Sequence, residues 1–374
     1  MSDSLSFWKT SCRMLARGVA VTLVTAGLIL TQAAYACTSF VLPSTDGGFV
    51  YGRTMEFGFK IDSKMIMIPR SFEMTSQLSA ATAGKKWQAK YATIGMNAFD
   101  LPALVDGMNE KGLAGGILFF PGFAQYTDPS TVKPENSLTP WDFLSWALGN
   151  FSTVAEVKAA LETVSVVGVV QADMGFTPGV HYTLHDATGA SIVIEPTDGK
   201  LKVFDNPLSV LTNAPSFDWH MTNLRNYVNL RPMNVEPLKI NDATIQPLGE
   251  GSGMLGIPGD ATPPSRFVRV SASILSARKV PSGIQSVRLA EHILNGFDIP
   301  IGLVQNAAND QQEGMDYTQW STIADMKNNV YYVKTYEEQI LRGVTFKDLD
   351  LNAKELLTIR IPTTVDALPV LQQK

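Results

Sequence analysis

Three residues near the start of this chain could together perform nucleophilic catalysis: Cys37, Arg53 and Glu56. A cysteine thiolate is a strong nucleophile, and a neighbouring cation lowers the pKa of the thiol. If Cys37 were the first residue of the processed chain, its own α-amine, with an ordinary pKa of about 7.7–8.0, could act as the base. A hairpin after Cys37 would return Arg53 to the thiol. Glu56 could then hold the amine by a charge-assisted hydrogen bond.

The segment before Cys37 has the pattern of a secretory signal peptide. Basic residues occur between positions 9 and 17, an uncharged apolar run covers residues 18–30, and Ala34-Tyr35-Ala36 is a small-residue cleavage motif. The apolar run is too short to span a bilayer as a helix, which takes about 20 residues. We therefore expect residues 1–36 to be removed. Residues 37–374 would then form a single domain that begins at Cys37.

Two alternatives concern this leader. Translation could begin at Met14, which would leave a more ordinary signal. A bacterial lipoprotein also has a cysteine at its processed N-terminus, where acylation makes it a membrane anchor. That signal favours Leu three residues before the cysteine and a small residue two before it, whereas Ala34 and the bulky Tyr35 stand here. These residues fit a lipoprotein signal poorly. A lipid-anchored, non-catalytic envelope protein is the alternative from another functional class.

The composition is that of an exported globular protein. The chain has 374 residues, a net charge of −5 and 45% hydrophobic residues, and the leader carries more basic than acidic residues. An acidic chain without a basic run argues against nucleic acid as a partner. No later apolar run is long enough for a membrane span, so we expect a periplasmic or secreted protein without a stable membrane anchor. Of the two cysteines, Cys12 lies in the leader, so the mature chain would hold a single thiol and no internal disulfide.

Strand patterns linked by tight turns and separate helical blocks predict an α+β domain of antiparallel sheets covered by helices. A capping box at Thr153–Glu156 opens one of the expected helices. Strands are expected at residues 38–42, 49–52, 64–69, 103–108, 113–120, 181–185, 190–196, 201–204, 208–213, 318–326 and 329–335, and helices at 140–148, 153–164, 217–229, 264–277 and 284–297.

The stretch C-T-S-F at residues 37–40, followed by Y-G-R-T-M-E-F at residues 51–57, resembles the start of the choloylglycine hydrolase family. This family includes bile salt hydrolases and penicillin V acylases, which are N-terminal-nucleophile hydrolases of linear amide C–N bonds. The similarity continues in the motifs at residues 113–122, 211–220 and 256–266. It implies a four-layer αββα sandwich of two antiparallel sheets. Family members are often tetramers, which implies a homo-oligomer here.

The resemblance also implies roles for individual residues. Cys37 would be nucleophile and base, and Arg53 would lie against its sulfur. Asn213 would donate a side-chain N–H to the oxyanion, and Arg266 would complete the polar network. Glu56 stands where most family members have Asp, so its hydrogen bond to the amine would need a shifted backbone.

A second departure is Phe119, which stands where bile salt hydrolases carry Asn and some penicillin acylases Tyr. Because Phe cannot donate a hydrogen bond, a second oxyanion contact would have to come from a backbone N–H. Phe119 also makes the mouth of the site more apolar. Together with other aromatic residues it is expected to line a pocket for an aromatic or long acyl group. These residues are Phe57, Phe59, Phe120, Phe123 and Tyr126.

Other motifs carry no chemistry. The sequence Gly251-Ser-Gly-Met-Leu-Gly256 fits a nucleotide-loop pattern, but no strand precedes it and Pro258 prevents a following helix. Glu291-His292 lacks a second histidine four positions on, and His181 and His185 lie in a strand pattern. We expect no metal and no cofactor.

The sequence thus predicts an amidohydrolase whose Cys37 attacks a small-molecule N-acyl amide and forms a thioester acyl-enzyme that water hydrolyses. A penicillin V acylase-like activity is favoured. Conjugated bile salts and N-acyl-homoserine lactones are the competing substrates.

Overall fold

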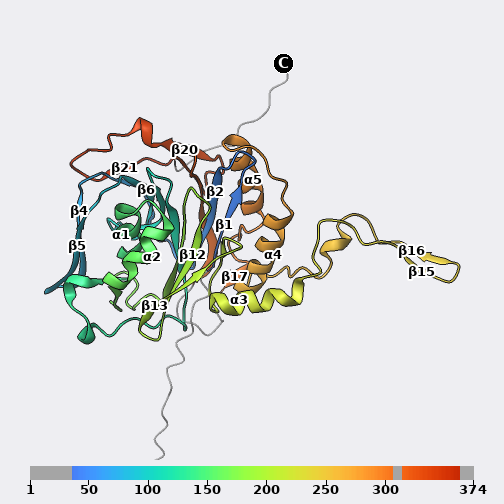
Figure 1. Cartoon of the computed structure of the whole chain (residues 1–374), viewed down its shortest axis with the longest axis horizontal. Coiled ribbons are helices and arrows are strands. Elements are labelled where there is room, and N and C mark those ends of the chain that lie inside the picture. Colours follow the sequence, from blue (N-terminus) through green and yellow to red (C-terminus); the bar gives the residue numbers. More distant parts are fainter. Residues whose placement is uncertain (1–35, 306–313, 363–374) are drawn as a thin grey trace, which may run out of the picture. The chain divides into compact units, whose positions relative to one another are not determined.

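The computed structural model describes residues 36–305 and 314–362, and two large antiparallel sheets form its centre (Figure 1). Sheet A has seven strands and begins with Cys37. Sheet B has eight. Sheet A consists of β14 (Val210–Leu211), β1 (Cys37–Pro43), β2 (Phe49–Phe57), β18 (Met315–Asp325), β19 (Val330–Thr335) and β20 (Arg342–Thr345) in that order, with β17 (Val304–Gln305) also paired to β18. Sheet B consists of β13 (Lys200–Asp205), β12 (Ser191–Thr197), β11 (Val180–His185), β8 (Ala114–Phe119), β7 (Leu104–Asn109), β6 (Thr93–Asn97), β3 (Met65–Ile68) and β21 (Leu357–Ile359).

Helices cover the outer face of each sheet. On sheet B, α1 (Asp142–Asn150) packs against β7 and β8, and α2 (Val154–Ala160) follows it. On sheet A, α4 (Pro263–Ser276) packs on β1 and α5 (Ile284–Asn295) on β2, and α3 (Phe217–Asn223) lies against α4 (Figure 1). The order helix, sheet, sheet, helix confirms the predicted αββα sandwich.

Burial on two faces explains why β1 and β2 show no polar alternation. All but the end residues of these strands are buried, because sheet B covers one face of sheet A and helices cover the other. Polar side chains in these strands, such as Arg53 and Glu56, must therefore find partners inside the protein.

Smaller elements complete the described structure. The hairpin β4 (Glu73–Ser79)–β5 (Thr82–Gln88) and the short parallel pair β9 (Ser137–Leu138) and β10 (Ser165–Val166) flank sheet B. A further hairpin, β15 (Leu238–Ile240)–β16 (Ala243–Ile245), projects from the body of the domain (Figure 1). Short 3₁₀ turns occur at Pro129–Thr131, Pro134–Asn136, Leu161–Thr163, Leu224–Tyr227, Ser252–Met254 and Phe346–Asp348.

The element boundaries differ in places from the predictions. The predicted helix at residues 153–164 ends as α2 at Ala160 and continues as a 3₁₀ turn, and α3 also passes into a 3₁₀ turn after Asn223. The capping box is present, because the Thr153 hydroxyl accepts from the Glu156 N–H. Strands β4 to β6, β9, β10, β15 to β17, β20 and β21 were not predicted. Most of them have only two to four residues, too few for a strand pattern, and β4 and β5 are mostly polar. The predicted signal peptide, except for Ala36, lies outside the described residues.

Candidate active site

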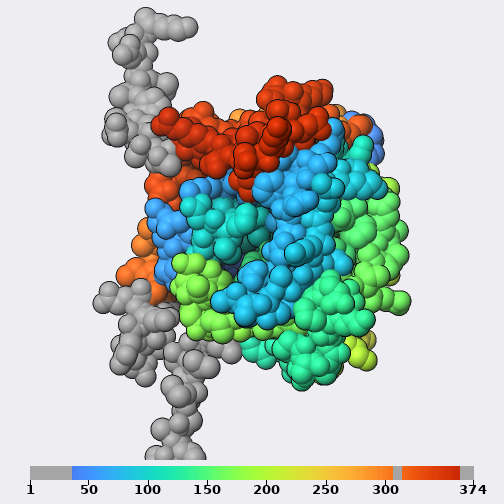
Figure 2. Space-filling model, turned by 90° about the vertical axis from the view of Figure 1, so that its left-hand side faces the viewer, coloured from blue at the N-terminus to red at the C-terminus, as the bar shows by residue number. Residues whose placement is uncertain are grey.

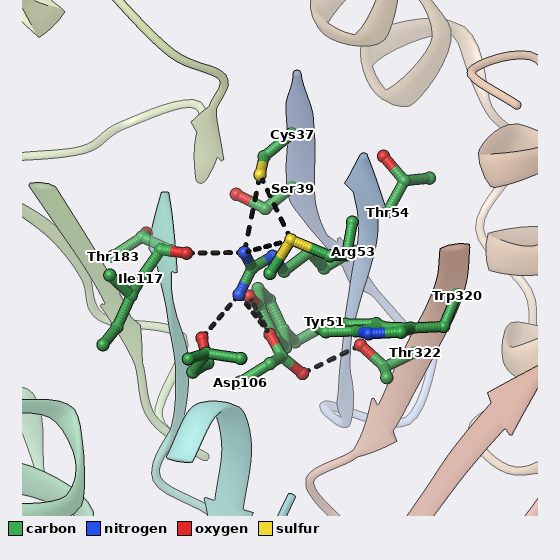
Figure 3. Close-up of polar contacts among 12 residues, drawn as sticks. Cys37, Ser39, Tyr51, Arg53, Thr54, Asp106, Ile117, Thr183, Trp320 and Thr322 are labelled. Carbon is green, nitrogen blue, oxygen red and sulfur yellow. Dashed lines mark hydrogen bonds and ion pairs between the residues drawn. The ribbon is translucent and has the colours of Figure 1, made fainter. Parts of the chain in front are cut away.

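The Cys37 side chain lies buried at the start of β1, and its sulfur contacts two side chains of β2 (Figure 3). Nη2 of Arg53 lies 3.5 Å from the Cys37 Sγ, and Sδ of Met55 lies 3.9 Å from it. The strand register places them together: Cys37 pairs with Met55 and Ser39 with Arg53, so these side chains share one face of sheet A. That face is turned toward sheet B.

Arg53 spans the space between the two sheets. Its Nη1 donates to the carbonyl of Val105 and its Nη2 to the carbonyl of Ile117, each at 2.5 Å. Burial acts to lower the pKa of Arg53, but the negative charges of Cys37 and Asp106 outweigh it and raise the pKa. The guanidinium is therefore a fixed cation beside the sulfur.

Asp106 on β7 is a functional residue that the sequence analysis missed. Its carboxylate is fully buried, with Oδ2 3.5 Å from Nη1 of Arg53 and accepting from the Tyr51 hydroxyl at 2.7 Å (Figure 3). Its Oδ1 accepts from the hydroxyls of Thr322 at 2.8 Å and Tyr331 at 2.5 Å. Burial raises the pKa of Asp106, and Arg53 and the three hydroxyls oppose this rise. An acidic residue inside an otherwise apolar strand, Leu104–Asn109, was the available signal.

Gly116 provides the room for this network. A Cβ at this position would lie 2.6 Å from the Tyr51 hydroxyl oxygen and 2.9 Å from both Arg53 Nη1 and Asp106 Oδ2. The network therefore passes directly over the Gly116 backbone, and any larger residue would displace it.

The backbone of Cys37 is held by Asn213 and Arg266. The Cys37 N–H donates to Asn213 Oδ1 at 2.6 Å, and Arg266 donates to the same oxygen at 2.7 Å. Arg266 also donates to the Cys37 carbonyl and to the Thr38 hydroxyl. The side-chain N–H of Asn213 donates to the Phe119 carbonyl at 2.9 Å. Asn213 thus lies next to the nucleophile, and its donation to an oxyanion stays a prediction.

Glu56 lies on the opposite face of sheet A from the Cys37 sulfur. Its Oε1 accepts from the Thr318 hydroxyl at 2.9 Å, and its Oε2 has no hydrogen-bond partner within the described part of the chain. Burial raises the pKa of Glu56 to about 7, against the attraction of Arg266. The Glu56 backbone N–H donates to the carbonyl of Ala36. In the uncleaved chain the carboxylate therefore does not contact the Cys37 nitrogen, and that role stays a prediction.

An apolar cavity opens beside the sulfur of Cys37. It comprises about 650 Å³ of space, including the part open to solvent, and Cys37 and Arg53 form its polar end. Its lining residues come from segments that are far apart in the chain. In Figure 2 these blue, teal and green segments meet on one face of the molecule. The remaining lining residues are Met55, Phe57, Ile61, Ala98, Phe99, Leu101, Val105, Ile117, Leu118, Phe119, Pro140, Trp141, Gln171, Met174, Pro178 and Val180.

The predicted aromatic residues divide into two groups. Phe57 and Phe119 line the cavity with their rings edge-on, 6.1 Å apart between centroids. Phe59, Phe120, Phe123 and Tyr126 are not among its lining residues. Phe120 is stacked on a buried histidine, and Phe123 is 42% exposed. Phe99, which the sequence analysis did not select, also lines the cavity, and its ring centroid lies 6.5 Å from that of Phe57.

Three histidines are buried and make structural contacts. The ring nitrogens of His185 contact the hydroxyls of Thr183 and Ser191 at 2.9 and 2.7 Å. Burial lowers the pKa of His185 to about 3 and that of His220 to about 4. Over residues 36–305 and 314–362, no three His, Cys, Asp or Glu side chains gather so that they could hold a metal ion. No helix in these ranges is both long and apolar enough to cross a bilayer.

Comparison with known proteins gives consistent matches along the chain. The sequence model of a family described as linear amide C–N hydrolases, choloylglycine hydrolase family, matches residues 37–359. A bile salt hydrolase/transferase of Clostridium perfringens is 35% identical over 88% of this chain and 98% of its own length. A penicillin V acylase of Pectobacterium atrosepticum is 25% identical, covering 84% of this chain and 81% of its own. The crystal structure of a variant of the C. perfringens conjugated bile acid hydrolase superposes with a TM-score of 0.76, at 35% identity, over 88% of this chain and 98% of that one.

Replacing Asp106 by Ala should destabilise the fold strongly. The change leaves the buried Arg53 without its counter-ion and three buried hydroxyls without their acceptor, which typically costs about 3–5 kcal/mol. Urea denaturation followed by fluorescence measures the free energy of unfolding. Asp100→Ala, which removes an exposed ion pair with Lys64, is the matched control and should cost under about 1 kcal/mol. Equal losses in the two variants would contradict this account of Asp106.

The contribution of His185 to the free energy of unfolding should fall as the pH is lowered below the ordinary histidine pKa of 6.5 toward about 3. In this window the unfolded chain binds a proton at His185 that the folded chain does not bind, so acid favours unfolding. His185→Gln should flatten the pH dependence in urea titrations, while the exposed His292→Gln should leave it unchanged. If the free energy of unfolding of His185→Gln depends on pH as steeply as that of the wild type, His185 is not the responsible group.

Proposed function

The chain belongs to the choloylglycine hydrolase family of linear amide C–N hydrolases, and on this premise we propose that it is an N-terminal cysteine amidohydrolase for amides with an apolar acyl group. The observation that carries the proposal is the position of the Cys37 sulfur. It lies 3.5 Å from a buried guanidinium, in a cavity whose other lining residues are apolar except for Gln171.

The proposed reaction uses Cys37 twice. Its α-amine takes the thiol proton, and the thiolate, stabilised by Arg53, attacks the amide carbonyl. The C–N bond then breaks, the amine leaves with the proton, and a thioester remains. Water cleaves the thioester and releases the acid, which restores the thiol.

This mechanism requires removal of residues 1–36. In the uncleaved chain the Cys37 nitrogen is an amide that donates to Asn213, and an amide nitrogen cannot act as a base. Cleavage after Ala36 would free the amine and vacate the place beside Glu56, whose Oε2 could then accept from it. The leader pattern and the family match that begins at Cys37 support this processing, with export to the periplasm or beyond.

The cavity supports an aromatic acyl group as the preferred substrate. Rings of Phe57, Phe99 and Phe119 meet edge-on at its wall, an arrangement that favours a further aromatic ring. We therefore place penicillin V, with its phenoxyacetyl group, first. Conjugated bile salts are the second candidate, supported by the 35% identity with the C. perfringens enzyme. N-acyl-homoserine lactones offer a linear apolar acyl chain to the same cavity.

Purified exported protein should have the mass of residues 37–374 and gain one carbamidomethyl group with iodoacetamide. Intact-mass spectrometry measures both, and Cys37→Ala is the control that should gain none. A mass raised by lipid, without alkylation, would contradict the enzyme proposal and support the lipid-anchored alternative. Cys37→Ala should also reduce amide hydrolysis by at least about a thousandfold.

A substrate panel tests the acyl preference. Released amine is measured for penicillin V, glycine- and taurine-conjugated bile salts, and N-acyl-homoserine lactones. We expect the highest kcat/KM for penicillin V, and Phe57→Leu should lower it about tenfold through KM, since it removes ring contacts worth about 1–2 kcal/mol. A higher kcat/KM for bile salts would favour the second candidate. Hydrolysis of none of them would refute the proposed substrate class.

The hairpin β15–β16 supports the proposal of a homo-oligomer. Leu238 pairs with Ile245 and Ile240 with Ala243, so one face of this hairpin is entirely apolar, and all four residues are exposed. A two-stranded hairpin is marginally stable by itself in water, which favours its being covered by a second copy of the chain. Replacing Leu238 and Ile245 by Ser should reduce the mass found by light scattering without changing the alkylation of Cys37. An unchanged mass would argue against this contact.

A further inference from the structure

Two buried histidines flank the backbone that carries Asn213. This backbone follows the two-residue strand β14 and leads into α3. His181 lies on β11 and His220 on α3, so they approach from different elements. Their ring nitrogens contact two consecutive carbonyls, those of Thr212 and Asn213.

His181 is fixed on both sides of its ring. Its Nε2 lies 3.0 Å from the Thr212 carbonyl oxygen, and because a carbonyl only accepts, this nitrogen carries a proton. Its Nδ1 lies 3.3 Å from Glu195 Oε1, and Phe120 stacks on the ring with centroids 4.5 Å apart. The same Glu195 oxygen accepts from the N–H of Phe217, the first residue of α3.

His220 makes the matching contact from α3. Its Nε2 donates to the Asn213 carbonyl at 2.8 Å, and its ring stacks on Phe267 with centroids 4.6 Å apart. Phe267 directly follows Arg266 in α4, and Arg266 donates to the Asn213 side chain. The Nδ1 of His220 has no hydrogen-bond partner within the described residues. The bond from Nε2 to the Asn213 carbonyl is therefore the one polar contact of the His220 ring within them.

We propose that His181 and His220 are positioning residues that hold Asn213 in place against the Cys37 nitrogen. The inference rests on the proposed function, because it assigns these residues to the same reaction. One carboxylate, Glu195, orients His181 and the start of α3, so the two imidazoles form a single clamp. Neither histidine lines the apolar cavity.

The clamp acts on chemistry rather than on substrate binding. Asn213 contacts the nitrogen that becomes the catalytic amine, and it does not line the acyl cavity. Loss of the clamp should therefore lower kcat and leave KM nearly unchanged. A histidine that only filled space would affect the stability of the fold but not kcat of the folded enzyme.

Two substitutions of His220 separate its hydrogen bond from its ring packing. His220→Gln retains an N–H at a similar distance from the backbone, whereas His220→Phe retains a ring on Phe267 and removes the donor. We expect His220→Phe to lower kcat at least tenfold with KM changed less than twofold. His220→Gln should keep kcat within threefold of the wild type. If His220→Phe fails to fold, His220→Asn takes its place. Its side chain has one methylene fewer than Gln, so its N–H does not reach the Asn213 carbonyl, and we again expect kcat to fall at least tenfold with KM changed less than twofold.

The alkylation of Cys37 by iodoacetamide gives a readout that does not depend on substrate. Loosening Asn213 shifts the Cys37 backbone relative to Arg53, so His220→Phe should slow alkylation at least threefold and His220→Gln should restore it. Equal kcat and equal alkylation rates in the two variants would overturn the clamp. A wild type that hydrolyses no amide would refute the proposed function, and the alkylation rates would still decide for or against the clamp.

Discussion

The buried guanidinium of Arg53 is the interaction on which the rest of the structure depends. A cation between two apolar sheets is tolerated only when its charge is compensated and its N–H groups have acceptors. Two carbonyls of sheet B and the carboxylate of Asp106 compensate the charge and accept from or face its two Nη atoms, while its Nε has no partner within the described residues, and these contacts join the two sheets at this point. The same arrangement turns one Nη toward the sulfur of Cys37. The contacts that join the two sheets thus also place a cation beside the proposed nucleophile.

The proposed nucleophile, Cys37, is the first residue of β1. At the first residue of β1 the ladder with β2 ends, and the neighbouring β14 delivers Asn213 to the Cys37 nitrogen. Arg266 from α4 closes the same corner from the helical layer. Sheet A and the helical layer thus both contribute polar groups to Cys37.

The two faces of sheet A carry different parts of the site. Arg53 and the acyl cavity lie on the face toward sheet B, whereas Glu56 and Arg266 lie on the face toward the helices. This separation follows from the alternation of side chains along β2. In the proposed reaction the acyl half of the substrate would occupy the apolar cavity, and the α-amine of Cys37 would meet Glu56 on the other face of the sheet.

The sequence by itself predicted the pairing of Cys37 with Arg53 and, through the family resemblance, the fold. A leader ending in Ala34-Tyr35-Ala36 before Cys37 and a short hairpin are local patterns, and local patterns are readable because neighbouring residues control them. Asn213 and Arg266 were added as site residues through the family resemblance of their motifs.

Only the tertiary structure decided the partners that come from distant strands. Asp106 lies 69 positions after Cys37, and its role depends on β7 facing β2 across the sandwich. The same holds for Phe99 and Trp141 in the cavity wall, and for Phe120 and Phe123, which lie outside it. Which side chains meet between two sheets depends on sheet packing and register, and no short stretch of sequence contains that information.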